Sequence, residues 1–119
     1  MCGLVGFYSS ETSNCFEDIF RMNTSITHRG PDDSGVWKDF DEGIVLGHSR
    51  LSIVDLSNSG SQPMISHSGR YVIVFNGEIY NHNDLRDDLS TLEQSICWKG
   101  HSDTETLLVA FEFWGIEET

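Results

Sequence analysis

Gly3-Leu4-Val5-Gly6-Phe7-Tyr8 begins almost at the N-terminus and predicts a short buried strand. The clearest other strand signal is Tyr71-Val72-Ile73-Val74-Phe75, which is β-branched and aromatic throughout. It ends abruptly at Asn76-Gly77, a pair that tolerates a positive φ. Two more strand segments are expected at residues 43–49 and 51–54.

Helices are expected between and after these strands. From Cys15 to Ile26 the apolar residues recur with a helical rhythm, which predicts a helix with one buried stripe. A shorter helix is expected to begin at Asp84 and to reach Leu89. Ser102-Asp103-Thr104-Glu105 has the spacing of a capping box, because Ser is followed three residues later by Glu. The apolar face of the helix after this cap is expected to consist of Leu107, Leu108, Phe111 and Trp114, and Gly115 can end the helix.

The remaining segments read as connections. Residues 28–35 contain Gly, Pro and Asp, and residues 55–62 are rich in Ser, Asn and Gly, so both are expected to be loops. The resulting order is strand, helix, strands, helix, helix. It indicates a mixed α/β or α+β domain.

Composition limits the function classes. The 119 residues contain 19 Asp and Glu against 7 Lys and Arg, which gives a formal net charge of −12. This length fits one domain, and 38% hydrophobic residues suffice for a packed core. Phosphates and anionic lipids must be neutralised by basic side chains, so neither nucleic acid nor a membrane surface is an expected partner. No apolar run approaches a membrane span, and no signal peptide is recognisable.

Cysteine and histidine do not form a metal or disulfide pattern. The three cysteines are an odd number without a CxxC pair, which favours a reducing, cytoplasmic setting over a disulfide framework or a zinc site. The spacing of the five histidines matches no compact ligand set, so surface or structural roles are expected and no metal is predicted. Neither a Walker loop nor GxGxxG occurs, so no nucleotide site is expected within these residues.

Two interpretations of Cys2 fit the sequence. It can be a small buried residue at the head of a strand. Alternatively, removal of Met1 would give Cys2 both a thiol and a free α-amine. An α-amine has a pKa of about 7.7–8 and can act as a general base near neutral pH. A thiol nucleophile with its base on the same residue needs no catalytic histidine.

Asn76-Gly77 and a set of charged residues are the other candidates. Asn76 and Gly77 could close a hairpin, or their side-chain amide and N–H could stabilise an oxyanion. Arg50 is the only charged residue within Ile44–Val54, and a carboxylate held bidentately is its natural partner. Glu78 and Asp103 could hold an ammonium group. Together these three suit a free amino acid, although Arg50 could also pair with one of the two carboxylates for structural reasons.

Taken in order, the motifs of this chain resemble a known family. They resemble the N-terminal glutaminase domain of the glutamine-dependent asparagine synthetases, which are class II glutamine amidotransferases with the N-terminal-nucleophile hydrolase fold. The resemblance covers nearly the whole chain. Related sugar-phosphate and phosphoribosyl amidotransferases do not typically carry the Arg-Gly-Pro-Asp and Arg-Leu-Ser-Ile-Val-Asp motifs. The matching motifs are Met1-Cys2-Gly3, His28 to Asp32, Gly47 to Asp55, Gln62-Pro63, Phe75 to Asn81 and Ser102 to Glu105.

The resemblance implies an α+β fold, a four-layer αββα sandwich, of which residues 1–119 would be a C-terminally truncated part. It implies that Cys2 is the nucleophile and that Asn76 and the N–H of Gly77 form the oxyanion hole. The implied substrate-binding residues are Arg50 for the α-carboxylate of glutamine, Glu78 and Asp103 for its α-ammonium, and the backbone at Ile53 and Val54. Arg29 is expected beside the nucleophile.

The resemblance also implies a larger reaction. Glutamine would be hydrolysed to glutamate and ammonia. Ammonia would pass to a C-terminal synthetase domain or subunit that uses ATP and Mg²⁺ to amidate aspartate to asparagine. No cofactor is expected within residues 1–119, and a homodimer of the parent protein is left open. Other carboxylate acceptors, such as a uronic-acid sugar, and an inactive glutamine-binding or truncated domain remain alternatives.

Overall fold

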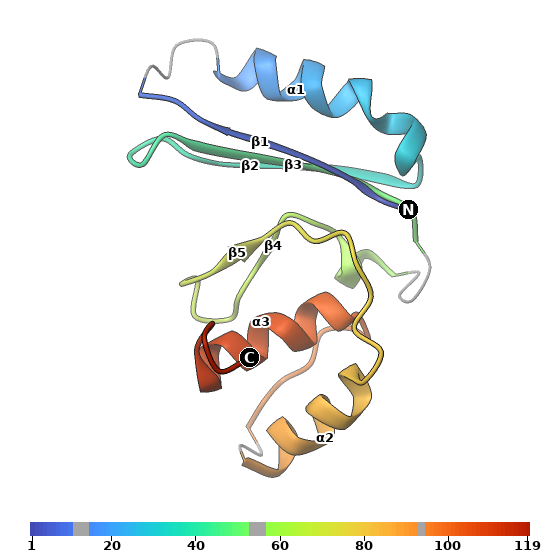
Figure 1. Cartoon of the computed structure of the whole chain (residues 1–119), viewed down its shortest axis with the longest axis vertical. Coiled ribbons are helices and arrows are strands. Elements are labelled where there is room, and N and C mark those ends of the chain that lie inside the picture. Colours follow the sequence, from blue (N-terminus) through green and yellow to red (C-terminus); the bar gives the residue numbers. More distant parts are fainter. Residues whose placement is uncertain (11–14, 53–56, 93–94) are drawn as a thin grey trace. The chain divides into compact units, whose positions relative to one another are not determined.

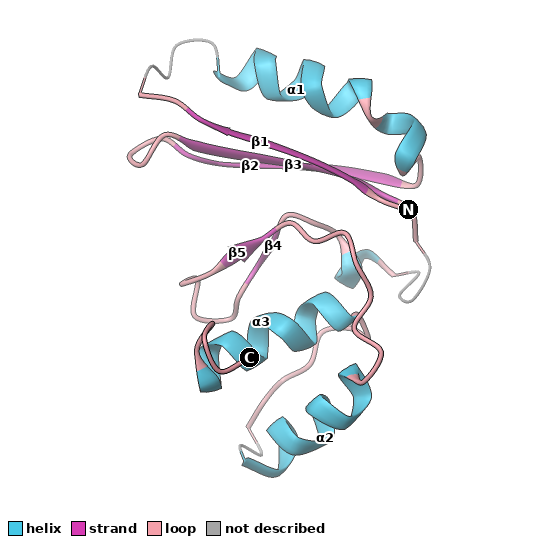
Figure 2. Cartoon of the chain, viewed as in Figure 1, coloured by secondary structure: helices cyan, strands magenta, loops and turns pink. Residues whose placement is uncertain are grey.

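The computed structural model describes residues 1–10, 15–52, 57–92 and 95–119. Helices and antiparallel strands both contribute, which confirms the predicted α+β class (Figures 1 and 2). In chain order the elements are β1 (Gly3–Tyr8), α1 (Cys15–Ser25), η1 (Thr27–Arg29), β2 (Asp33–Asp39), β3 (Ile44–Arg50), η2 (Asn58–Gly60), β4 (Met64–Ile65), β5 (Val72–Ile73), α2 (His82–Leu92) and α3 (Asp103–Trp114).

The chain divides into two compact units. Unit 1 comprises Met1–Ile53, Ser61–Pro63 and Val74–Asn76. Unit 2 comprises Val54–Gly60, Met64–Ile73 and Gly77–Thr119. Each unit combines a sheet with at least one helix, so each can be described by itself.

Unit 1 is a three-stranded antiparallel sheet, here called sheet A, with α1 lying along one face (Figure 1). The central strand is β3, which pairs with β1 on one side and with β2 on the other. Its core contains Cys15 and Ile19 of α1 and Val45 of β3. The predicted amphipathic helix at residues 15–26 is therefore present, ending one residue earlier at Ser25.

Alternation along β3 separates two sets of side chains. A Cβ on Gly47 would lie 3.4 Å from Ile19 Cδ1, and Ser49 Oγ donates to Asn23 Oδ1 over 3.1 Å, so these two positions face α1. Successive strand residues point to opposite faces. His48 and Arg50 therefore project from the face of sheet A opposite α1, which we call the open face.

Unit 2 contains the two-stranded antiparallel sheet β4–β5 and the helices α2 and α3. Leu89 of α2 packs with Val109 and Ala110 of α3 in its core. The predicted N-cap is confirmed, because Ser102 Oγ accepts from Glu105 N over 3.1 Å. Gly115 follows the helix with a φ of 82°, a conformation that favours glycine.

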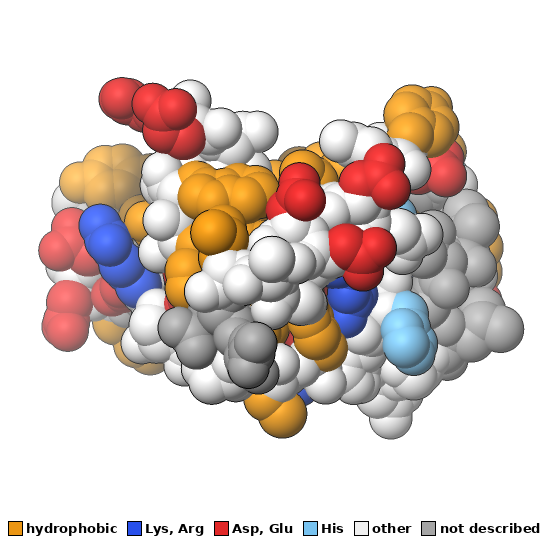
Figure 3. All heavy atoms as spheres, turned by 90° about the horizontal axis from the view of Figure 1, so that it is seen from below, with side chains coloured by type: hydrophobic (Ala, Val, Ile, Leu, Met, Phe, Trp, Pro, Cys, Tyr) orange, Lys and Arg blue, Asp and Glu red, His pale blue; other side chains and the backbone are white. Residues whose placement is uncertain are grey.

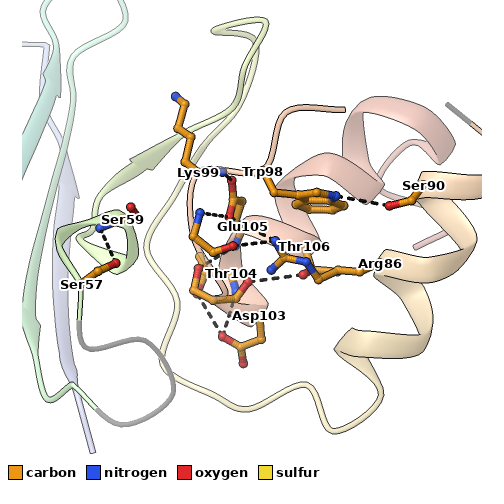
Figure 4. Close-up of polar contacts among 12 residues, drawn as sticks. Ser57, Ser59, Arg86, Ser90, Trp98, Lys99, Asp103, Thr104, Glu105 and Thr106 are labelled. Carbon is orange, nitrogen blue, oxygen red and sulfur yellow. Dashed lines mark hydrogen bonds and ion pairs between the residues drawn. The ribbon is translucent and has the colours of Figure 1, made fainter. Parts of the chain in front are cut away.

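The reciprocal half of the expected capping box is replaced by other contacts. The carboxylate of Glu105 accepts from Lys99 N at 2.7 Å and from Gly100 N at 3.0 Å. Arg86 lies 3.7 Å from the same carboxylate, and its guanidinium lies 3.9 Å from the centroid of the Trp98 ring (Figure 4). Glu105 therefore ties the segment before α3 to α2, rather than bonding back to its own cap.

Several predicted boundaries were wrong. Residues 33–35 were expected in a loop, yet they begin β2, and the short strand β4 was not predicted. The strand expected at 71–75 is only Val72–Ile73, because Phe75 bonds to side chains instead of to a strand.

The helix expected at 84–89 extends over His82–Leu92. In the segment expected at 51–54, residues 51 and 52 are not in a strand, and residues 53 and 54 lie outside the described residues.

Acidic side chains are spread over the face shown in Figure 3, with apolar and neutral side chains between them. Exposed apolar side chains include Tyr80, which is 88% exposed, and Ile116. Across the described ranges, no helix is both long enough and apolar enough to cross a membrane.

Candidate active site

Cys2 lies directly before β1 and is half-buried. Its Sγ accepts a hydrogen bond from Leu51 N at 3.2 Å and lies 3.5 Å from Leu51 O. The β1–β3 register pairs Gly3 with Ser49, so one further step places Cys2 opposite Arg50. Directly opposed residues of an antiparallel pair share a face. Cys2 and Arg50 therefore both belong to the open face of sheet A.

Arg50 is the last residue of β3 and is only 7% exposed. In the register with β2 it lies opposite Asp33. Its carbonyl accepts from Asp32 N over 3.0 Å, and the Asp32 carboxylate accepts from Ser52 N over 2.8 Å. Asp32 thus holds the chain at Arg50 and again at Ser52, which fixes the end of the strand beside Cys2.

The loop before β2 packs closely on this strand end. A Cβ on Gly30 would lie 2.3 Å from Ser49 O, so only glycine lets the loop come so near. Arg29, whose side chain is exposed, starts beside the N-terminal strand. Its Cβ lies 3.2 Å from the position of a Cβ on Gly3. These contacts give the Arg-Gly-Pro-Asp motif a structural role next to Cys2.

Asn76 is exposed, and it directly follows Phe75, whose backbone N–H and carbonyl both contact side chains. Phe75 N donates to Gln62 Oε1 over 2.6 Å, and Phe75 O lies 3.3 Å from His48 Nε2. The hairpin interpretation of Asn76-Gly77 is wrong, because the pair connects β5 to α2. Unit 1 therefore contains Cys2, Arg50 and Asn76.

Unit 2 contains the other described candidates. Asp103 is 7% exposed at the start of α3, and its Oδ2 accepts from Ile79 N at 3.0 Å. Its Oδ1 accepts from Thr104 N at 2.8 Å. Glu78, the neighbour of Ile79, is exposed. Unit 2 thus brings the segment containing Gly77 and Glu78 to the carboxylate of Asp103, whereas the predicted pocket residues Ile53 and Val54 lie outside the described residues.

His48 and Gln62 were not among the predicted site residues. His48 was expected only to have a surface or structural role, and Gln62 appeared only within a motif. His48 directly follows the apolar run Ile44–Gly47 of β3, which was the signal for its burial. Its link to Phe75 could not be predicted, because it joins residues 27 positions apart.

His48 should make stability depend on pH. Burial lowers its pKa below the ordinary value of 6.5, with a smaller lowering contribution from Arg50. Below pH 6.5 the unfolded chain therefore binds a proton that folded His48 does not, so the free energy of unfolding falls as the pH decreases. The limit is about 1.4 kcal/mol per pH unit.

The measurement is urea unfolding between pH 7.5 and 5.5. His48→Gln should weaken the pH dependence, while the exposed-residue control His28→Gln should keep it. An unchanged pH dependence in His48→Gln would contradict the assignment to His48.

The family model for the glutamine amidotransferase domain matches residues 1–119. The chain belongs to this family. Such an amidotransferase domain agrees with the α+β class, and the family is one of N-terminal-nucleophile hydrolases. Within the described residues of this amidotransferase domain, no group of three or more His, Cys, Asp or Glu side chains could hold a metal ion.

Curated relatives of this amidotransferase domain are named asparagine synthetases of the glutamine-hydrolysing type. Asparagine synthetase 1 of Bacillus subtilis is 40% identical over 96% of the chain and 18% of its own length. Asparagine synthetase 3 of the same organism is 37% identical over 96% of the chain and 18% of its own length. Asparagine synthetase B of Escherichia coli is 34% identical over 98% of the chain and 20% of its own length. The amidotransferase domain spans about a fifth of the length of these relatives.

Proposed function

We propose that residues 1–119 supply the glutaminase half of a glutamine-hydrolysing asparagine synthetase. The observation that carries this proposal is the placement of the Cys2 thiol at the end of sheet A, on the face that also bears Arg50. A nucleophile and a cation for a carboxylate are two requirements for attack on a free amino acid. The family match and the names of the relatives supply the reaction class.

In the proposed reaction Met1 is first removed. While Met1 is attached, the nitrogen of Cys2 is an amide and cannot act as a base. The released α-amine takes the proton of the Cys2 thiol, and the thiolate attacks the side-chain carboxamide carbon of glutamine. This attack forms a C–S bond and places negative charge on the carboxamide oxygen.

The amide of Asn76 and the N–H of Gly77 would donate to that oxygen. The C–N bond then breaks, and the nitrogen leaves as ammonia with the proton held by the Cys2 amine. Water attacks the resulting γ-glutamyl thioester, which gives glutamate and restores the thiol. Each step uses groups of this chain and water only.

Substrate recognition is assigned to charged groups. Arg50 would hold the α-carboxylate of glutamine, because a guanidinium can donate two parallel hydrogen bonds to a carboxylate. Glu78 and Asp103 would hold the α-ammonium, and the backbone at Ile53 and Val54 would line the pocket. Arg29 would stay beside the nucleophile without contacting the reacting atoms.

Ammonia would be used by a part of the protein beyond this domain. The names of the relatives favour aspartate as the acceptor over another carboxylate such as a uronic-acid sugar. ATP and Mg²⁺ would activate that acceptor in a synthetase domain or subunit, and no residue of this chain is assigned to them. A cytoplasmic location and a homodimeric parent protein belong to the same proposal.

The direct test uses a glutamine analogue that alkylates thiols. After incubation and proteolysis, mass spectrometry should find one adduct, on Cys2, and excess glutamine should protect against it. Intact mass shows whether Met1 has been removed. Cys97 is exposed and serves as an internal control for unspecific labelling. An adduct on Cys97 or Cys15 in place of Cys2 would overturn the nucleophile assignment.

Arg50→Ala should mainly raise the KM for glutamine. Losing one partner of a buried charge pair costs about 2 kcal/mol or more, which corresponds to a roughly 30-fold higher KM. The kcat should change far less, because the carboxylate is held equally in the ground state and the transition state. Steady-state ammonia release measures both constants. A KM that stays at the wild-type value would contradict the role of Arg50.

A further inference from the structure

A short segment from later in the chain, residues 74–76, lies against the open face of sheet A. Residues 74–76 belong to unit 1, although they come 24 residues or more after β3 ends. Phe75, the residue directly before Asn76, is hydrogen-bonded to this part of the protein. Both backbone groups of Phe75 are engaged by side chains, since its N–H donates to Gln62 and its carbonyl lies against His48.

His48 is fixed in position and in tautomer. It is 0% exposed on the central strand, so its ring is enclosed by the protein. A carbonyl oxygen can only accept, and therefore Nε2 carries the proton and donates to Phe75 O over 3.3 Å. Nδ1 is buried and has no hydrogen-bond partner among the described residues, so a proton on Nδ1 would find no acceptor there.

Gln62 is held on the neighbouring strand β2, at Gly35, the residue that pairs with His48. It is 8% exposed, and its backbone carbonyl lies where a Cβ on Gly35 would be only 2.1 Å away. Gly35 of β2 therefore allows residues 61–63 to rest directly on the strand. The neighbouring Ser61 Oγ donates to Asp33 Oδ2 over 2.6 Å, which anchors the same segment to β2.

The two side chains thus connect sheet A to the backbone of Phe75, the residue before Asn76. We propose that His48 and Gln62 are positioning residues, which hold the Phe75 backbone so that the Asn76 amide is aimed at the developing oxyanion. This inference rests on the proposed glutaminase function. A donor displaced by about 1 Å can cost up to about a hundredfold in rate, so a clamp on the preceding residue suffices to matter.

The test compares variants that keep a hydrogen bond to the Phe75 backbone with variants that remove it. In His48→Gln the amide nitrogen can occupy the place of Nε2 and reach Phe75 O. In His48→Asn the shorter amide corresponds to Nδ1 and cannot reach it. Gln62→Leu keeps the approximate shape and removes the acceptor for Phe75 N, whereas Gln62→Glu retains an acceptor.

In steady-state glutamine hydrolysis, His48→Asn and Gln62→Leu should each lower kcat by about tenfold to a hundredfold. The KM for glutamine should change by less than about threefold. His48→Gln and Gln62→Glu should recover most of the lost kcat. Labelling of Cys2 by a simple thiol reagent should proceed at the wild-type rate in all four, since the nucleophile itself is not displaced.

A double-mutant cycle separates positioning from general loss of structure. If His48 acts through Asn76, adding His48→Asn to Asn76→Ala should lower kcat by less than about twofold further. Effects that multiply in full, or a kcat unchanged in the single variants, would overturn the inference while leaving the glutaminase function intact. If His48→Asn or Gln62→Leu does not fold, the kcat of the folded variant His48→Gln or Gln62→Glu decides. A tenfold loss of kcat in that variant would contradict the expected recovery. Absence of glutamine hydrolysis and of Cys2 labelling in the wild-type protein would instead overturn the proposed function itself.

Discussion

Replacing Cys2 with alanine is expected to reduce glutamine hydrolysis by a factor on the order of 10⁴ or more, to the background of the assay. The thiol is the only group assigned to form the covalent bond, and removing a nucleophile eliminates nearly all chemical catalysis. The half-buried position of Cys2 at the strand end predicts little change in stability. Glutamine-dependent ammonia release measures the effect, and thermal unfolding shows whether the variant is folded.

Two matched variants make this result specific. Cys97→Ala removes an exposed cysteine in unit 2 and should leave kcat and KM unchanged. Cys2→Ser keeps the size and the α-amine but has a much weaker nucleophile, so it should resemble Cys2→Ala. Substantial hydrolysis by Cys2→Ala would show that another group attacks the substrate.

Asn76→Ala should lower kcat by about 10²–10³, which corresponds to about 2.7–4 kcal/mol of lost transition-state stabilisation. The reason is that the Asn76 amide is needed only when charge develops on the substrate oxygen. The KM for glutamine should therefore remain near the wild-type value. The side chain is exposed, so no comparable loss of stability is expected.

Asn83→Ala provides the control, because it removes an exposed amide from α2, close by in sequence. It should leave both constants unchanged. If Asn76→Ala raised KM and spared kcat, Asn76 would be a binding residue, and the oxyanion assignment would be wrong. The same outcome would remove the basis for positioning by His48 and Gln62.

Much of this fold follows from local sequence patterns. The helix beginning at Cys15 appears where its apolar periodicity predicts it. The strand at residues 3–8 is also present, but the prediction that it is buried was wrong, because Leu4 and Tyr8 are exposed on the face away from α1. The Ser102 cap is also local, because the donor lies three residues after the acceptor. By contrast, β2 begins in a segment rich in Asp, Ser and Gly, and its strand conformation depends on pairing with β3.

The candidate residues divide in the same way. Cys2, Arg50, Asn76, Glu78 and Asp103 could be named from the chemistry that each side chain and its neighbours suggest. Their grouping could not, because unit membership depends on long-range contacts. The Phe75 backbone binds His48 and Gln62 in unit 1, while Gly77 begins a segment of unit 2.

The sequence alone determined the family motifs, the chemical types of the proposed catalytic groups, and the elements whose periodicity is local. Tertiary structure decided which sheet face carries Cys2 and Arg50, and why the strand signal at 71–75 stops short. It also turned Glu105 from an expected capping partner into a link between α2 and the segment before α3. The physical reason is that a backbone or carboxylate group binds whichever partner folding brings near, and the sequence order does not encode that proximity directly.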